Sequence, residues 1–331
     1  MSEGSTTTAP RGLAALASHE ALRTPRVILA GLVAFVGFYF FGDLIDYPAD
    51  ERFEPALLRQ DMGLAKVLLL MLGLAAMTLL GTALAGKVRY DAGWAAAVAG
   101  LIALRLRAGE SFHAFQGSTR SVFVLLAVEL VVLAIIAGAM WTMLHVLRER
   151  GTTSPWLKRW LELPTPAYRL ADRKASSDDL GQQIMALLAH TGITAVIVLL
   201  LCRSDAKAQV LASVAIASFA GSFVVQGNVI ATRPAAWFLA GPVLCGLIGY
   251  LYGFLASTPT DLALGRPSGP LAALARPMPL DWIAAGVPAS LWAYVNRRTH
   301  QLNSVMDVMD AGEPSNANAA PVAESNTAPG S

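Results

Sequence analysis

The chain has 331 residues, of which 55% are hydrophobic and 15% are charged, and its formal net charge is +2. A typical soluble domain carries about 25% charged residues, so this composition argues against a soluble globular protein. No run of basic residues interleaved with aromatic side chains occurs, which excludes a surface built for nucleic acid. The apolar residues come in blocks of about 20, the length of a helix that spans a bilayer.

Six of these blocks predict transmembrane helices. Each is long enough, at ~1.5 Å per residue, to cross a hydrocarbon core ~30 Å thick. The first block follows Arg23 and Arg26 and has no small-residue cleavage site after it, so we predict a retained span rather than a signal peptide. The six segments cover residues 27–46, 64–86, 121–147, 183–202, 208–231 and 235–256.

Two weaker segments, 92–104 and 281–296, share a pattern. Each is led by an aspartate and a tryptophan and closed by arginines, with Asp281 leading the second segment and Arg105 closing the first. Tryptophan at one end and arginine at the other suit the two interfaces of a short span. With the six strong segments, they predict an all-α polytopic membrane protein of about eight transmembrane helices. Each weak segment falls beside three strong ones, so two groups of four could be halves of an internal repeat.

This interpretation divides the chain into five parts. Both tails are small, polar and punctuated by proline, so we expect them to be disordered, with an interfacial helix as a further possibility for the first. In the basic loop, Ser154 can cap a helix that carries Trp156 and Trp160 on one face, which predicts a short interfacial helix or, alternatively, a solvated linker. The parts are the N-tail 1–25, the first transmembrane group 26–147, the basic loop 148–182, the second transmembrane group 183–298 and the C-tail 299–331.

The distribution of charge predicts the orientation. The loop 43–63 holds six acidic residues and two arginines, which places the N-terminus in the cytoplasm. The numbers of Lys and Arg on the two sides do not separate eight spans from six. Eight spans put the densest basic loop, 148–182, on the cytoplasmic side, and we favour them for that reason. Both arrangements place the C-terminus inside, and we expect a cytoplasmic membrane of the prokaryotic type.

Motifs for chemistry are scarce. The sequence contains no HExxH, paired CxxC or GxSxG motif, and its five histidines occur singly. GTALAGKV, residues 81–88, resembles a phosphate loop, but Val88 replaces the hydroxyl that binds magnesium and the glycines fall within a span. We therefore predict no catalytic residue, cofactor or metal ligand, and the sequence disfavours an enzyme without excluding one.

Glu129 is the sharpest functional candidate. It lies inside SVFVLLAVELVVLAIIAGAMW, where a charge costs about 2.5–3.5 kcal/mol near a helix centre, so it should face protein or water. It could serve as a proton or cation site, or as a neutral or paired acid that joins helices. His190 is the second candidate. The depths of the two residues differ by roughly 8 Å, so direct contact would require helix tilt or an intervening water.

The position of His190 can be predicted from its hairpin. Its span and the next are joined by residues 203–207, so the two helices are antiparallel neighbours and His190 lies level with residue 220. Ser218 or Ser222 could then bond to the imidazole beside a close approach at Gly221. In the following span, Gly249 and Gly253 have the GxxxG spacing of helix packing.

The function favoured by the sequence is a transporter or permease for a small solute or a proton. The alternative is a non-catalytic scaffold or assembly factor that recruits partners through the basic loop and the tails. The expected partners are the lipid bilayer and either a second copy of the chain or an unidentified protein.

Overall fold

The structure is a computed structural model, and all the secondary structure that it describes is helical. The predicted N-tail up to residue 22, the SPWLKRWLELP segment and the C-tail lie outside the described part of the chain, and so does most of the predicted span 64–86; residues 23–25 of the predicted N-tail belong to the first described helix. The described residues are 23–44, 56–57, 69–70, 72–77, 80, 91–151, 180–228 and 236–294.

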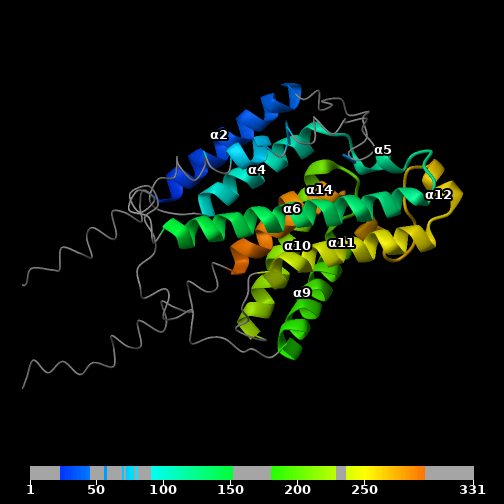
Figure 1. Cartoon of the computed structure of the whole chain (residues 1–331). Coiled ribbons are helices and arrows are strands. Elements are labelled where there is room, and N and C mark those ends of the chain that lie inside the picture. The colour runs from blue at the N-terminus through cyan, green and yellow to red at the C-terminus, as the bar shows by residue number, and fades with distance from the viewer. Residues whose placement is uncertain are drawn as a thin grey trace, which may run out of the picture.

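Four long apolar helices form most of the bundle (Figure 1). Each contains a stretch long and apolar enough to cross a membrane. Two further helices, α2 (Arg23–Leu44) and α4 (Asp91–Arg107), pack side by side, and α4 in turn packs on residues 279–286. The all-helical membrane architecture is therefore confirmed for four candidate spans. The four are α6 (Ser121–Gly151), α9 (Leu180–Leu201), α10 (Lys207–Asn228) and α11 (Ala236–Ala256).

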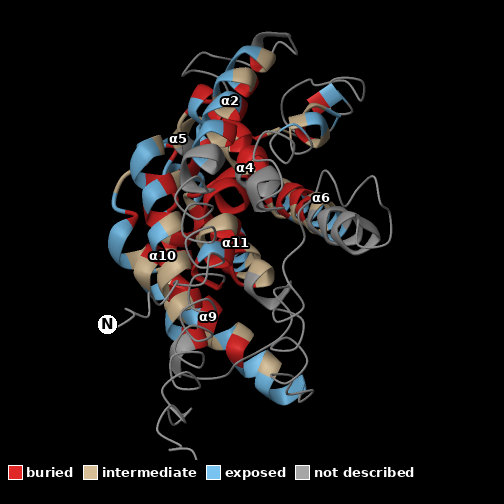
Figure 2. Cartoon of the chain, turned by 90° about the vertical axis from the view of Figure 1, so that its left-hand side faces the viewer, coloured by how far each residue is buried: buried red, intermediate tan, exposed pale blue. Residues whose placement is uncertain are grey.

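The exposure of α9 is inverted relative to a helix on a soluble protein. Its apolar side chains point outward, with Met185 65% and Leu188 60% exposed, whereas His190 and Thr194 are buried. Figure 2 shows this outward face on α9 and a similar one on α10. Lipid solvates apolar side chains and penalises polar ones, so this pattern is the one expected of a helix in a bilayer.

The second weak segment forms a helix in the middle of the molecule. It comprises α14 (Pro279–Asp281), the π-helical turn η2 (Trp282–Gly286) and the helical residues 287–294, and we call residues 279–294 the central helix. Every residue from 279 to 287 is buried. A helix surrounded by protein needs less apolar surface than one facing lipid, which explains why its sequence signal is weak.

The π-helical turn has a local cause in the sequence. Pro288 cannot donate the hydrogen bond that would close an α-helical turn, and its ring would press on the carbonyl group of residue 284. The wider turn just before it relieves this crowding, with the N–H of Val287 donating to the carbonyl oxygen of Trp282.

The helix ends at one end of the bundle are tied together by short helices and loops, which we call the loop cap (residues 106–120, 202–206 and 257–278). It contains α5 (Ser111–Phe115), α12 (Pro259–Ala263) and α13 (Ala272–Ala275), and Figure 1 shows α5 and α12 at this end. Arg120 Nε donates to the carbonyl oxygen of Ser257 over 2.7 Å. Arg276 Nη1 donates to that of Cys202 over 3.0 Å. Guanidinium groups thus satisfy carbonyl groups just beyond the C-terminal ends of α11 and α9.

The cap also fixes the direction of α2, α4 and α10. Arg107, the last residue of α4, donates to the carbonyl oxygen of Tyr39 near the end of α2, and its guanidinium carbon lies 4.9 Å from the centre of the Tyr39 ring. Lys207 Nζ, at the start of α10, lies 3.3 Å from the carbonyl oxygen of Leu106. The C-terminal ends of α2 and α4 and the N-terminal end of α10 therefore lie together.

Gly249 and Gly253, predicted to support helix packing, face two different neighbours. A Cβ atom at Gly249 would lie 2.1 Å from the carbonyl oxygen of Leu274 in α13, and one at Gly253 would lie 2.5 Å from the ring of Phe123 in α6. Real Cβ contacts are not this short, so both positions require glycine, which has no side chain.

Candidate intramembrane polar site

Two clusters of buried polar side chains lie inside the bundle, and the central helix contributes to both. Asp281 in its first turn belongs to one, and Ser290 near its other end belongs to the second. The helix begins at the loop cap, where Pro279 occupies the first helical position and Asp281 caps the first turn through the N–H of Met278. This start places Asp281 beside the end of α4.

The first cluster is built on an ion pair between Arg105 and Asp281. Arg105 Nε lies 2.5 Å from Asp281 Oδ1, and neither side chain is exposed. Arg105 Nη1 donates to the carbonyl oxygen of Gly109 over 2.7 Å, and Asp281 Oδ2 accepts the N–H of Met278 over 2.7 Å. Arg105 Nη2 is buried and has no hydrogen-bond partner among the described residues. An unsatisfied guanidinium nitrogen is unusual in a protein interior.

Tyr250 and Glu129 complete this cluster. The hydroxyl group of Tyr250 is buried and donates to the carbonyl oxygen of Pro277 over 2.7 Å. The Asp281 and Glu129 carboxyl groups and the Arg105 guanidinium group all act electrostatically on this hydroxyl. We call Arg105, Glu129, Tyr250 and Asp281 the acid–base cluster.

Close helix packing sets the level of Glu129. Its neighbour Leu130 lies against Gly246, where an added Cβ would come within 2.7 Å of Leu130 Cδ2 and 2.8 Å of Trp282 Nε1. Glu129 therefore enters the bundle from α6 level with the start of the central helix, and only 2% of it is exposed. The acid–base cluster thus holds two carboxyl groups and one guanidinium group.

The second cluster surrounds His190. Its Nε2 lies 3.3 Å from the carbonyl oxygen of Ser218 and 3.2 Å from Ser290 Oγ. Ser290 Oγ donates to the same carbonyl oxygen over 3.2 Å, and Ser222 Oγ donates to the carbonyl oxygen of Ser290 over 2.8 Å. A carbonyl oxygen only accepts, so the hydrogen of the neutral imidazole is assigned to Nε2. We call His190, Ser218, Ser222 and Ser290 the serine–histidine cluster.

Two glycines make room for the imidazole of His190. A Cβ atom at Gly221 would lie 2.8 Å from His190 Cδ2, and one at Gly241 would lie 2.2 Å from His190 Nδ1. The structure places His190 at the level given by hairpin geometry. The bond from Ser218 comes through its main-chain carbonyl group rather than its hydroxyl, and Ser222 bonds to Ser290 instead of the imidazole.

Sequence reasoning did not identify Tyr250 or Ser290, and it assigned Arg105 and Asp281 to membrane interfaces. The structure buries both charged residues and pairs them. The available signal was that each weak segment has an aspartate at its start and arginines at its end. The buried pair places the end of α4 against the start of the central helix.

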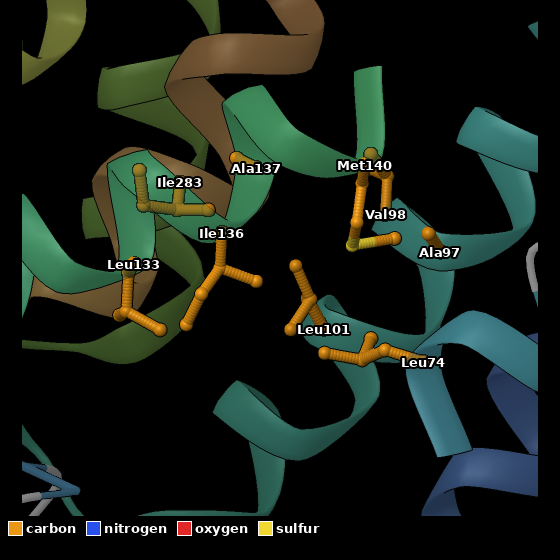
Figure 3. A pocket seen from close by; sticks show the side chains of 9 residues that line it. All are labelled: Leu74, Ala97, Val98, Leu101, Leu133, Ile136, Ala137, Met140 and Ile283. Carbon is orange, nitrogen blue, oxygen red and sulfur yellow. The ribbon is translucent and has the colours of Figure 1, made fainter. Parts of the chain in front are cut away.

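The cavity shown in Figure 3 is lined by none of the residues of either cluster. Its volume is about 20 Å³, close to the minimum for one water molecule, and only apolar side chains line it, including Leu101, Leu133 and Ile283. Such a cavity has no group that would hold a polar solute. Within the described ranges, no group of three or more metal-ligating side chains comes together.

Comparison of the chain with protein-family models, with curated proteins and with solved structures finds no match. The clusters are therefore interpreted from their own geometry.

Proposed function

We propose that the chain is an eight-span membrane protein that carries a proton through its helical bundle, with Glu129 as the proton-binding residue. The observation that carries this proposal is the buried Glu129 carboxyl group in a cluster where Asp281 already pairs with Arg105. A carboxylate buried inside a membrane span is costly, and binding a proton removes its charge.

The directions of three helices support eight spans over six. In a six-span arrangement, in which 92–104 and 281–296 do not cross, the end of α2 and the start of α10 lie on opposite faces of the membrane. Arg107 joins the end of α2 to α4, and Lys207 joins the start of α10 to the same end of α4. The eight-span arrangement places all of these ends on one face, which is then the outer face, with both termini in the cytoplasm.

Cysteine labelling tests this topology. In a background without Cys202 and Cys245, Ser268→Cys should react with a membrane-impermeant maleimide added outside, because Ser268 is exposed in the loop cap. Ser154→Cys in the basic loop should react only after the membrane is permeabilised. Reaction of Ser154→Cys from outside would show that the eight-span arrangement is wrong.

A proton fits the described interior better than a larger solute does. The apolar cavity has room for about one water molecule and contains no polar group. A proton needs no cavity, only titratable groups and hydrogen bonds. We assign His190 a structural role, because hydroxyl and carbonyl groups from α10 and the central helix surround its Nε2.

Proton flux into vesicles tests the function. Purified protein in liposomes with an internal pH-sensitive dye should acidify the lumen under an imposed potential, and Glu129→Gln should reduce the rate to that of empty vesicles. Asp261→Asn, an acid-to-amide change in the loop cap, is the matched control and should retain the wild-type rate. Wild-type flux in Glu129→Gln would overturn the proposal. The scaffold alternative would be supported if the wild-type protein carried no proton flux and if deletion of residues 154–174 abolished its function.

A further inference from the structure

We propose that Asp281 retains α4 inside the membrane, so that α4 is fully embedded only once the central helix has joined the bundle. The buried ion pair between Arg105 and Asp281 is the contact that holds the two helices together. This inference rests on the proposed eight-span arrangement, in which both helices cross the membrane, and it does not depend on the role of Glu129.

The helix α4 is a weak membrane helix on its own. Among the described helices, it is not one of those long and apolar enough to cross a bilayer, and its last turn contains Arg105 and Arg107. Membrane insertion disfavours arginine strongly, and an arginine at the end of a span usually extends to the lipid headgroups or to water. Arg105 does not do so, because no part of its side chain is exposed. α4 therefore needs a partner for this charge within the protein.

The packing of α4 supplies one such partner. α4 packs on α2 through apolar contacts, where Gly100 leaves space for the ring of Phe38. Contacts of this kind offer nothing to a guanidinium group. α4 also packs on residues 279–286 of the central helix, and Asp281 in this stretch forms the ion pair with Arg105. The central helix thus brings the carboxylate that α4 requires.

The central helix is less dependent on α4. Its π-helical turn η2 packs on α10, α11 and α6 as well as on α4, and every residue from 279 to 287 is buried. Asp281 also accepts the N–H of Met278 in its own helix turn. We therefore expect loss of the ion pair to release α4 and to leave the central helix in place.

The order of the two residues in the chain gives this contact its consequence. Arg105 precedes Asp281 by 176 residues, whereas its bond to the carbonyl oxygen of Gly109 reaches only four residues along the chain. The ion pair can form only after the central helix has been synthesised and has packed on α4. The first transmembrane group is therefore completed by the last described helix of the second.

Thiol accessibility tests the inference. Val98 in α4 lines the apolar cavity, so in the background without native cysteines Val98→Cys should resist a water-soluble maleimide on permeabilised membranes. Asp281→Leu leaves Arg105 charged and unpaired, because a guanidinium group does not release its proton, and should raise the labelling rate at least ~10-fold. Arg105→Leu combined with Asp281→Leu should return the rate to its original value. Leu133→Cys, on the α6 wall of the same cavity, is the matched control and should stay unreactive in every variant.

Two further variants separate this role from a general loss of stability. Arg105→Leu breaks the same ion pair but removes the charge from α4, so Val98→Cys should remain protected. Gly241→Ala crowds the His190 ring, far from α4 in the contacts described, and should also leave Val98→Cys protected. Equal labelling in Asp281→Leu and Arg105→Leu would mean that the pair stabilises the bundle without retaining α4, and would overturn the inference.

The remaining outcomes distinguish this inference from the proposed function. Unchanged labelling of Val98→Cys in Asp281→Leu, or rapid labelling with the pair intact, would overturn the inference alone. Reaction of Ser154→Cys from outside would overturn the eight-span arrangement instead. Should Asp281→Leu fail to accumulate in the membrane, the double variant with Arg105→Leu should accumulate normally, and its failure to do so would also overturn the inference.

Discussion

The acid–base cluster and the serine–histidine cluster each include one residue of the central helix, and each contains a buried titratable residue. The two clusters differ in the kind of group that they place near this residue. Around His190, the partners are neutral, and hydroxyl and carbonyl groups of α10 and the central helix match its neutral imidazole. In the acid–base cluster the groups are charged, and Arg105, Glu129 and Asp281 all act electrostatically on the Tyr250 hydroxyl group. Burial alone therefore does not separate Glu129, for which we propose a function, from His190, to which we assign a structural role; the charge of the neighbouring groups does.

The largest effect should come from breaking the ion pair of the acid–base cluster. Arg105→Leu leaves the Asp281 carboxylate buried without its cation and should lower the free energy of unfolding by about 3–5 kcal/mol. The measurement is unfolding in mixed micelles with increasing SDS. Arg105→Leu combined with Asp281→Leu removes both charges and should recover most of this loss. A loss below about 1 kcal/mol in the single variant would show that the pair is solvated.

For the serine–histidine cluster, the prediction concerns the space that Gly241 leaves for the His190 ring. Gly241→Ala places a Cβ on the His190 ring and should destabilise the protein by about 1–3 kcal/mol. His190→Ala should relieve the clash, so Gly241→Ala should cost little in that background, and proton flux per folded molecule should stay at the wild-type level. Gly192→Ala is the control, because nothing lies within 4 Å of its Cβ position. Loss of flux in folded His190→Ala would remove the contrast between the clusters.

The loop cap above the acid–base cluster should exclude reagents. Burial raises the pKa of the Cys202 thiol to about 12, and the nearby Arg276 guanidinium group only partly offsets this. The thiolate fraction at pH 8 is then ~1000-fold below that of a thiol with the ordinary value of 9.0. Maleimide should label Cys202 only after unfolding, as followed by mass spectrometry. Rapid labelling in the folded protein would mean that water enters the cap.

The smallest effect is expected at Asp261 in α12, whose carboxyl group is not buried in the bundle. The hydroxyl and main-chain N–H groups of Thr258 and the hydroxyl of Ser268 hold the pKa of Asp261 below its usual value of 3.8. The resulting stability is present above pH 3.8 and is lost as the pH falls through the lowered value. Amide exchange in α12 should therefore be unchanged from pH 7 to 5 and should accelerate only in stronger acid, relative to the rate expected for free peptide. Acceleration near pH 6 would contradict this.

The sequence predicted the spans of α6, α9, α10 and α11 well, because apolar blocks facing lipid leave a clear signal. The predicted 183–202 and 208–231 became Leu180–Leu201 and Lys207–Asn228. It also predicted that Glu129 and His190 face the interior, since lipid excludes them. The ion pair could not be predicted, because Arg105 and Asp281 are 176 residues apart and no periodic pattern connects them. Each instead resembles an interfacial residue at the end of a short segment.

The π-helical turn just before Pro288 sets the relative orientation of the two clusters. A turn of this kind contains one more residue than an α-helical turn, and each residue rotates a helix by about 100°. Asp281 precedes the turn and Ser290 follows it, so the extra residue determines which way Ser290 points once Asp281 is fixed on Arg105. Deleting one alanine from the turn would rotate Ser290 away from His190 while leaving the ion pair in place. The register of a single turn thus decides whether one helix can serve both clusters.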